Sequence, residues 1–421
     1  MRLLYINHYA GGPAYGMEHR PYYLAREWAR RGHEVLVVGA SFAHVRTRQP
    51  EVTGRFSREE RDGIRFVWCR TPAYVGNGVR RVVNIATFLY RLRRWRQWLD
   101  MVPDVVIASS TYPADMGVAR RIAAAHGAPL VWEVHDLWPM SPVELGGMSR
   151  RHPFIVWMQL AEDAACRDAD LVVSMLPLAE PHLREHGLLP GRFEYVPNGV
   201  DPDEWSEAAD APAQSVIPAG HVAAIAEARA RGDLLVAYTG AHGIANDLNA
   251  LLDAATALRG EPVTWLLVGD GPEKPQLERL AAGRGLDRVR FLDPVPKSAV
   301  PALLLGMDVL YIGLQPQSVF RFGISPNKLT DYLMAGRPIV SAIAAGNDPV
   351  SEARCGITVA PGRPEATANA IRQLAAMAPR ERDAMGMRGR DYVRARHTYP
   401  VLARRFLEAI EAARAGRGSG D

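Results

Sequence analysis

Residues 263–292 read VTWLLVGDGPEKPQLERLAAGRGLDRVRFL, the pattern of one strand–helix–strand unit. The apolar run Val263–Val268 is followed by a turn and a longer helical segment, and Val289–Leu292 is the next short apolar run. Runs that are apolar throughout, rather than alternating with polar residues, are typical of parallel strands covered by helices on both faces. This stretch therefore predicts a parallel α/β sheet.

Units of this kind repeat through almost the whole chain in two series, which predicts two doubly wound α/β domains. Ligands of such sheets bind beyond the carboxyl ends of the strands, so chemistry is sought just after each strand, and two sheets suggest a cleft between domains. The predicted strands are Leu3–Ile6, Glu34–Val38, Arg65–Trp68, Asp104–Ala108, Leu130–Val134, Asp170–Val173 and Phe193–Val196 in the first series, then Leu234–Tyr238, Val263–Val268, Val289–Leu292, Val309–Ile312, Pro338–Ser341 and Ile357–Val359.

The predicted domain boundary lies in Asp201–Asp233, where Pro, Ala and acidic residues replace the strand rhythm. We expect one domain over 1–205 and a second over 206–399, with a C-terminal helix over 400–421 that packs back on the first. The segment Asp383–Asp421 has no strand signal and predicts terminal helices that fray from Gly416.

Composition excludes several classes of protein. With 421 residues, 48% hydrophobic and 23% charged, the chain is neither disordered nor too short for two cores. The balance of 50 basic and 46 acidic residues argues against a dedicated nucleic-acid binder. Three scattered cysteines without a CxxC pair fit a reducing cytosol. No signal peptide and no spanning apolar run is visible, which predicts a cytoplasmic protein.

The segment 320–338, FRFGISPNKLTDYLMAGRP, predicts a helix that could bind a nucleotide. Lys328 falls in its first turn, where exposed N–H groups and the helix dipole favour phosphate, and Asp331 lies one turn on, placed to accept ribose hydroxyls. The alternative is a surface helix on which Lys328 and Asp331 pair with each other. The expected ends are Ser325 as N-cap, Pro326 as first helical residue, and Gly336 and Pro338 as terminators.

The string SPNKLTDYLMAGRPIV resembles the donor-binding signature of retaining glycosyltransferases of family 4, which have the GT-B fold. Further similar stretches are YINHYAGGPAYGMEHRPYYLA at 5–25, WEVHDLWP at 132–139, VPNGVD at 196–201 and LLVGDGPEKPQLE at 266–278. The subgroup most resembled is the L-fucosamine transferase type of O-antigen and capsule enzymes. The resemblance implies two Rossmann-like domains that face an interdomain cleft, the first for the acceptor and the second for a nucleotide-sugar donor.

For the donor site, the resemblance implies that Lys328 binds phosphate and Asp331 binds ribose, where most of the family has Glu. The family's other Glu falls on Gly323, so backbone N–H groups of Arg321–Ile324 are expected to contact the sugar or phosphates instead. The loop 238–246 lacks the Arg and Lys of many relatives, with His242 its one candidate cation, which leaves Lys328 and Arg321 to neutralise the diphosphate. Ser325 and Asn327 complete the expected donor segment.

Other expected site residues follow strands. His135, with Glu133 and Asp136 to orient its ring, is expected to position the sugar for a reaction in which the leaving diphosphate accepts the proton; the alternative is a loop residue with a local hydrogen bond. Gly11 and Gly12 precede a helix beginning near Glu18 and could bring backbone amides to a phosphate, or form only a tight turn. Asp270, Gly271 and the segment 295–297 are expected to border the base, although GDGP is also a plain turn.

The segment Val79–Leu99 carries six arginines and no acidic residue. One reading is a helix whose Arg91, Arg94 and Trp95 meet an anionic membrane or a lipid pyrophosphate, and the other is a helix that covers the sheet with its apolar stripe. The stripe is Phe88, Leu92, Trp95 and Leu99, with Trp98 as a further membrane contact.

No metal site is expected. His182 and His186 match an HxxxH pattern without a recognised third ligand, and the D-x-D pairs at 168–170 and 201–203 lie before a strand and at the domain boundary. The sequence thus predicts a hexosyl- or N-acetylhexosaminyltransferase. It would move a sugar, an N-acetylated amino sugar, from a UDP donor to a lipid-linked or glycan acceptor in surface polysaccharide biosynthesis, without a cofactor, and would be peripheral on the membrane. Rivals are a non-hydrolysing sugar-nucleotide epimerase, transfer to a soluble small molecule, a nicotinamide-dependent oxidoreductase and a non-catalytic sensor.

Overall fold

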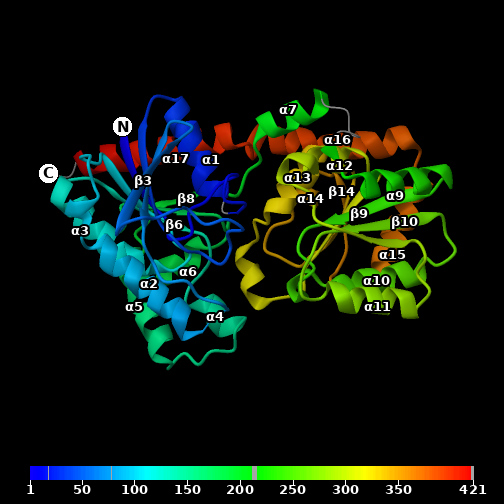
Figure 1. Cartoon of the computed structure of the whole chain (residues 1–421), viewed down its shortest axis with the longest axis horizontal. Helices are drawn as coiled ribbons and strands as arrows, with labels where there is room; N and C mark the ends of the chain where they lie inside the picture. Colours follow the sequence, from blue (N-terminus) through cyan, green and yellow to red (C-terminus); the bar gives the residue numbers. More distant parts are fainter. Residues whose placement is uncertain (18, 77, 211–215, 419–421) are drawn as a thin grey trace. The chain divides into compact units, whose positions relative to one another are not determined.

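The computed structural model describes residues 1–17, 19–76, 78–210 and 216–418. The chain forms two compact units, Met1–Asn198 together with Tyr399–Asp421, and Gly199–Thr398. In each unit helices lie on both faces of one β-sheet (Figure 1). The α/β class with two Rossmann-like domains is therefore confirmed.

The described part of the first unit holds an eight-stranded sheet of order β3-β4-β2-β1-β5-β6-β7-β8, parallel except for the β3–β4 edge pair. Its strands are β1 Arg2–Ile6, β2 Glu34–Ala40, β3 Phe56–Arg61, β4 Ile64–Cys69, β5 Val105–Ala108, β6 Leu130–Val134, β7 Leu171–Ser174 and β8 Phe193–Tyr195. Its helices are α1 His19–Arg30, α2 Val79–Leu92, α3 Met116–His126, α4 Met140–Glu144, α5 Pro153–Asp168, α6 Glu180–Glu185 and α17 Tyr399–Gly418, with 3-10 turns η1 Trp95–Gln97 and η2 Pro113–Asp115.

The described part of the second unit holds a six-stranded parallel sheet of order β11-β10-β9-β12-β13-β14. Its strands are β9 Leu234–Thr239, β10 Val263–Val268, β11 Val289–Leu292, β12 Val309–Gly313, β13 Ile339–Ala342 and β14 Gly356–Thr358. Its helices are α7 Pro202–Asp210, α9 Ala219–Ala230, α10 Leu248–Ala257, α11 Lys274–Gly283, α12 Val300–Leu305, α13 Asn327–Ala335, α14 Pro349–Glu352, α15 Pro364–Ala376 and α16 Pro379–Arg396, with 3-10 turns η3 Ile244–Asn246, η4 Lys297–Ala299 and η5 Ser318–Phe322.

The strands are apolar throughout because both faces of each sheet are covered. On β9, Leu235 and Ala237 belong to one buried cluster while Val236 and Tyr238 belong to the cluster on the opposite face. In the first unit, α17 (red in Figure 1) lies beside α1, where the indole of Trp28 donates to the carbonyl of Ala403 over 3.1 Å. Parallel strands bring their carboxyl ends to one edge, so polar residues after several strands meet there.

Some predicted boundaries differ from the structure. The two units divide at Asn198–Gly199, so residues 199–205 belong to the second unit rather than the first. Strand β3 was not predicted, because its sequence FSREER is charged and lies exposed on the sheet edge. Helix α17 continues through Gly416 to Gly418; Glu18 and residues 419–421 lie outside the described residues, as do residues 211–215 of the expected boundary segment.

Candidate functional site

The start of helix α13 holds Lys328 at the carboxyl edge of the second sheet. The Nζ atom of Lys328 donates to the Tyr238 hydroxyl and to Oδ1 of Asn246, each over 2.8 Å, and lies 4.4 Å from the centre of the Tyr238 ring. Burial lowers the pKa of Lys328 to about 7. Among the described residues, no carboxylate lies within ion-pair distance of this ammonium group. It is a cation without an anionic partner at a helix N-terminus, which suits a phosphate.

Asp331 binds a lysine that the sequence analysis did not single out as its partner. Both carboxylate oxygens accept from Nζ of Lys297, over 2.9 and 2.8 Å, and Lys297 also lies 3.7 Å from Glu204. Burial alone would lower the pKa of Lys297, but the charges of Asp331 and Glu204 raise it. The alternative in which Lys328 and Asp331 pair with each other is therefore wrong, and the ribose-binding role of Asp331 stays a prediction.

The chain has only three lysines among its 50 basic residues, Lys274, Lys297 and Lys328, and all three contact this edge. Lys274 donates to the carbonyl of Gly269 and to Asp293, each over 3.1 Å. An arginine stays protonated when buried, whereas a lysine changes its pKa. Lys328, whose pKa burial lowers to about 7, is therefore the lysine of this edge that can titrate near neutral pH.

His242 is not the cation that the sequence suggested. Its side chain is buried, and neither ring nitrogen has a hydrogen-bond partner among the described residues. Burial, followed by the charge of Lys274, lowers the pKa of His242 to about 4, so the ring is neutral. His242 therefore supplies no positive charge to this edge and offers a neutral donor and acceptor instead.

Asp270 and Gly271 form a loop that packs tightly on the His242 loop. The carbonyl of Asp270 accepts from the His242 N–H over 2.8 Å, and Oδ1 of Asp270 accepts from the Gly271 N–H over 2.8 Å. Gly271 has φ +157°, and a Cβ there would lie 2.5 Å from the His242 carbonyl oxygen. These contacts explain the residues as a turn that holds His242; contact with the base stays a prediction.

The segment before α13 is organised differently from the prediction. The N-cap is Pro326 and the first helical residue is Asn327, so Ser325 precedes the cap, while Gly336 ends the helix with φ +64° as expected. The N–H groups of Gly323 and Ile324 already donate, to the Phe320 carbonyl and to Oδ1 of Asn347. They are therefore not free to bind a sugar or phosphate in this conformation.

Arg321 lies on η5 in front of α13 and is exposed. Its guanidinium donates to the Ser318 carbonyl over 2.7 Å and lies 4.4 Å from the centre of the Phe322 ring. These contacts hold the side chain against its own 3-10 turn. A role for Arg321 in neutralising the diphosphate stays a prediction.

His135 lies at the carboxyl edge of the first sheet within a buried network. Its Nε2 atom lies 2.8 Å from Oγ of Ser109 and 3.2 Å from Oε2 of Glu133. Glu133 forms a buried ion pair with Arg20 over 2.8 Å and accepts from the hydroxyl of Tyr5. Burial by itself would raise the pKa of Glu133, but the Arg20 charge and the hydrogen bonds from His135 and Ser109 overcome it and hold that pKa well below its usual range.

The anionic Glu133 fixes the tautomer of His135. A carboxylate only accepts, so Nε2 of His135 carries a proton, and in the neutral form of the ring Nδ1 is an acceptor. Such a ring can accept a hydrogen bond from a sugar hydroxyl through Nδ1. The carboxylate of Asp136 does not orient the His135 ring. It accepts instead from the Leu137 N–H, the Trp138 indole and the Ser141 hydroxyl. No contact with His135 therefore supports the expected catalytic role of Asp136.

Gly11 and Gly12 close their own loop. The Gly12 N–H donates to the Met17 carbonyl over 2.9 Å, and a Cβ on Gly11 would lie 2.2 Å from that same oxygen. Gly12 also has φ +136°, with the Tyr22 ring against it. The tight-turn reading accounts for both glycines, and the Gly12 amide is not free for a phosphate.

The basic segment is shorter as a helix than predicted. Helix α2 ends at Leu92, and Trp98 is completely buried, so the expected membrane contact of Trp98 is wrong. Phe88 and Leu92 are also buried, and the guanidinium of Arg91 donates to the Arg55 carbonyl over 3.2 Å. The apolar stripe covers the sheet, while Arg94 lies exposed against the Tyr90 ring and Trp95 is half-buried.

The site residues that the sequence analysis missed as partners are Tyr238, Asn246, Lys297, Ser109 and Arg20. Tyr238 and Ser109 lie at or just after carboxyl ends of strands, so that rule could have found them. Arg20 gives no such signal, because it reaches Glu133 from a helix.

No helix in the described part of the chain has the length and apolarity that a membrane span needs.

Comparison with known proteins assigns a family domain to each unit. Residues 15–199 match the glycosyl transferase 4-like domain, and residues 233–377 match the glycosyl transferases group 1 domain. The chain is 26% identical over 341 residues to the putative colanic acid biosynthesis glycosyl transferase WcaI of Escherichia coli K12, covering 76% of this chain and 78% of that protein. It is 28% identical over 354 residues to the 2-deoxystreptamine glucosyltransferase of Streptomyces kanamyceticus, covering 81% and 84%.

The fold is also that of solved glycosyltransferase-like structures. Anabaena Alr3699/HepE in complex with UDP and glucose superposes with a TM-score of 0.65 at 16% identity, covering 97% of this chain and 99% of that one. With a glycosyltransferase domain matched in each of its two Rossmann-like units, the chain belongs to the glycosyltransferases of the GT-B fold.

Proposed function

We propose that this glycosyltransferase moves an N-acetylated amino sugar from a UDP donor to a glycan or lipid-linked acceptor of surface polysaccharide, with retention at the anomeric carbon, as in the L-fucosamine transferase type. The observation that supports a UDP donor is Lys328, a half-buried ammonium group at the N-terminus of α13. Its pKa is about 7, and it has no anionic partner among the described residues. A diphosphate supplies the missing anion. UDP as the nucleotide is supported by the HepE structure, which contains UDP and glucose.

The second half of the proposal concerns turnover. His135, with its proton fixed on Nε2 by Glu133, positions the donor sugar through Nδ1, and the leaving diphosphate accepts the acceptor's proton. Lys328 and the N–H groups at the start of α13 neutralise the diphosphate, so the reaction needs no divalent cation.

A screen of UDP-sugars with glycan and lipid-linked acceptors, read by mass and by the anomeric NMR signal of the product, tests this function. We expect equal rates with magnesium and with excess EDTA, and a product of the donor's own anomeric configuration. Turnover of a UDP-sugar without any acceptor would favour the epimerase, and transfer only to small soluble molecules would favour the other rival. Inverted configuration, or loss of activity on chelation, would contradict the mechanism.

Peripheral attachment to the cytoplasmic membrane face is part of the proposal. The outer face of α2 carries exposed Val79, Val83 and Tyr90 at helical spacing, flanked by exposed Arg80 and Arg94. An anionic leaflet attracts each nearby arginine by about 1 kcal/mol.

Co-sedimentation with anionic and zwitterionic vesicles tests the attachment. Exchange of Arg80, Arg93, Arg94 and Arg96 for Gln should abolish pelleting with anionic vesicles, as should high salt, because salt screens exposed charges. Exchange of Arg229 and Arg290 of the second unit is the control and should change nothing. Equal pelleting of the quadruple variant and the wild type would leave α2 as a covering helix only.

A further inference from the structure

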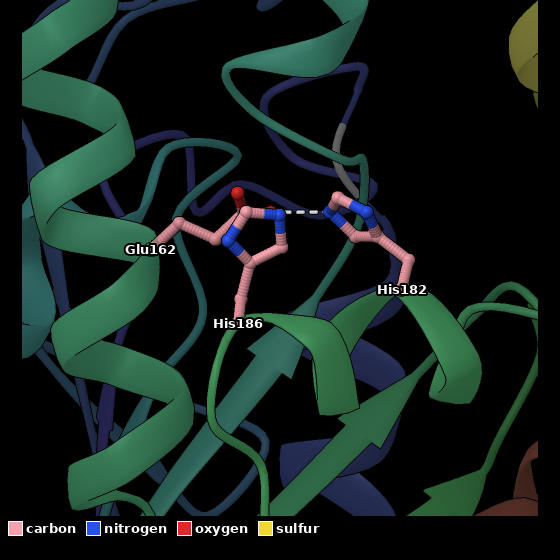
Figure 2. A group of neighbouring side chains, drawn as sticks. All are labelled: Glu162, His182 and His186. Atoms are coloured by element: carbon pink, nitrogen blue, oxygen red, sulfur yellow. Dashed lines mark hydrogen bonds and ion pairs between the residues drawn. The ribbon is translucent and has the colours of Figure 1, made fainter.

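Helices α5 and α6 of the first unit bring together the third ligand that the HxxxH pattern lacked. Figure 2 shows Glu162 of α5 converging with His182 and His186, which lie one turn apart on α6 and at its C-cap. Each offers one ligand atom, and these atoms lie within 4.8 Å of one another. From this geometry we propose that Glu162, His182 and His186 form a binding site for a divalent transition metal of the zinc class.

The donor set fits this metal. Zinc binds imidazole nitrogen and carboxylate oxygen at about 2.0–2.2 Å, and tetrahedral angles then place neighbouring ligand atoms about 3.4 Å apart. Nε2 of His182 lies 3.0 Å from Oε1 of Glu162, so a cation would take the place of the proton between these two atoms, and the neutral ring would then carry its proton on Nδ1. His186 is partly exposed, and its ligand atom lies within 4.8 Å of the other two, so a small shift of its ring would complete the set.

A second layer of contacts orients the ligands. Nδ1 of His186 lies 2.8 Å from Oδ1 of Asp163, which leaves Nε2 to bind the cation. The amide nitrogen of Gln159 donates to Glu162 and Asp163 over 2.8 and 2.9 Å. A carboxylate on the far nitrogen of a ligating histidine is the usual support of such a ligand.

Charge balance points the same way. Glu162 and Asp163 place two carboxylates beside two imidazoles, and no arginine of the described chain lies within ion-pair distance of either carboxylate, although Arg150 lines the same cavity. The side chain of Glu162 is 1% exposed, so water screens this carboxylate poorly, whereas Asp163 is partly exposed. A divalent cation neutralises the pair of carboxylates.

The ligands also face open space. A cavity of about 290 Å³ is lined by Glu162, His182 and His186 together with the apolar side chains of Met140, Val143 and Val156. It leaves room for a water molecule as fourth ligand. The cation would tie α6 to α5 at a place distinct from Ser109, Glu133 and His135, so it would stabilise the first unit without entering the transfer reaction.

Calorimetric titration of the tag-free, chelator-treated full chain with ZnCl2 tests the site. We expect one zinc per chain, a higher Tm with zinc, and no effect of MgCl2. His182→Ala and Glu162→Gln should weaken zinc binding by about 100-fold or more, and Asp163→Asn by about 10-fold, because it only supports a ligand. His126→Gln, in the same unit, is the matched control and should bind as wild type.

Cobalt spectroscopy of the wild type keeps the test independent of whether the variants fold. Co2+ should give the intense visible absorption of a tetrahedral site, and zinc should remove it. Absence of zinc binding, or zinc binding that persists in the His182→Ala and Glu162→Gln variants, would reduce the cluster to a hydrogen-bonded network and overturn the proposal.

Discussion

The carboxyl edges of the two sheets balance their charges in opposite ways. In the first unit, Glu133 is paired with Arg20 inside the protein, and the side chains are 0% and 3% exposed. In the second unit, Lys328 contacts a phenol and an amide but no described carboxylate, and its pKa has fallen to about 7. The first edge is balanced before any ligand arrives, whereas the second holds one balanced pair, Lys297 with Asp331, and a lysine, Lys328, that an anion would balance. Preorganised groups suit the reacting centre, and an unbalanced cation suits a diphosphate.

Removal of the internal cation should break the first edge. We expect Arg20→Ala to lower the free energy of unfolding by about 3–5 kcal/mol, because it leaves the Glu133 charge buried and unpaired. Urea unfolding measures this. The control Arg2→Ala removes a half-exposed ion pair with Asp104 and should cost about 0–1 kcal/mol. Equal effects of the two variants would show that the Arg20 pair does not organise this edge.

The His135 variant should separate turnover from binding. His135→Ala should lower kcat roughly 10²-fold, since a misplaced sugar reacts slowly, and should leave the Kd for UDP nearly unchanged. Steady-state kinetics and UDP calorimetry measure the two quantities. His33→Ala is the control, because His33 lies just before β2 and its ring contacts the amino group of Met1. Normal turnover at saturation with weakened UDP binding would make His135 a ground-state ligand instead.

Variants at the carboxyl edge of the second sheet should change the affinity for UDP. Lys328→Ala and Asp331→Ala should each weaken the binding of UDP by about 1.5–3 kcal/mol, the range for a lost hydrogen bond to a charged group. Calorimetric titration gives the affinities, and thermal unfolding checks that the variants are folded. Arg372→Ala, which removes a surface pair with Glu261, is the control. Unchanged affinity in both site variants would remove the donor site from α13.

The fold was well predicted because each strand and helix leaves its pattern within a short stretch of sequence. Apolar runs gave the thirteen strands named above within a few residues, but not the charged edge strand β3. The position of Lys328 in the first turn of α13 was also predictable, since Gly336 and Pro338 mark the other end of that helix.

Partners that meet only in the folded chain were not predictable. Lys297 is 34 residues from Asp331, and Glu162 is 20 residues from His182. Neither separation leaves a periodic signal. The neutral state of His242 depends on burial and on Lys274, which its own loop does not reveal. For the same reason the glycines at 11 and 12 could not be assigned between a turn and a phosphate loop.

The pH dependence of UDP binding is the finest test of the comparison. Burial lowers the pKa of Lys328 to about 7 in the free protein, and a bound diphosphate must raise it, because the anion favours the charged form. Below pH 7 the lysine is already protonated and contributes no slope. Above pH 7 binding takes up a proton, so affinity should fall by up to about tenfold per pH unit until the bound-state pKa is reached.

Calorimetry between pH 7 and 9 in buffers of different ionisation enthalpy counts the proton taken up. The diphosphate of UDP is largely ionised there, since phosphate groups lose their second proton near pH 6. Lys328→Arg should remove both the slope and the proton uptake, because an arginine stays charged, while Lys274→Arg should keep them. His242 adds no slope in this range, because its pKa is about 4. If the affinity of Lys328→Arg still falls with pH, the titrating group lies elsewhere. Lys328 would then not be the group that distinguishes the second edge from the first.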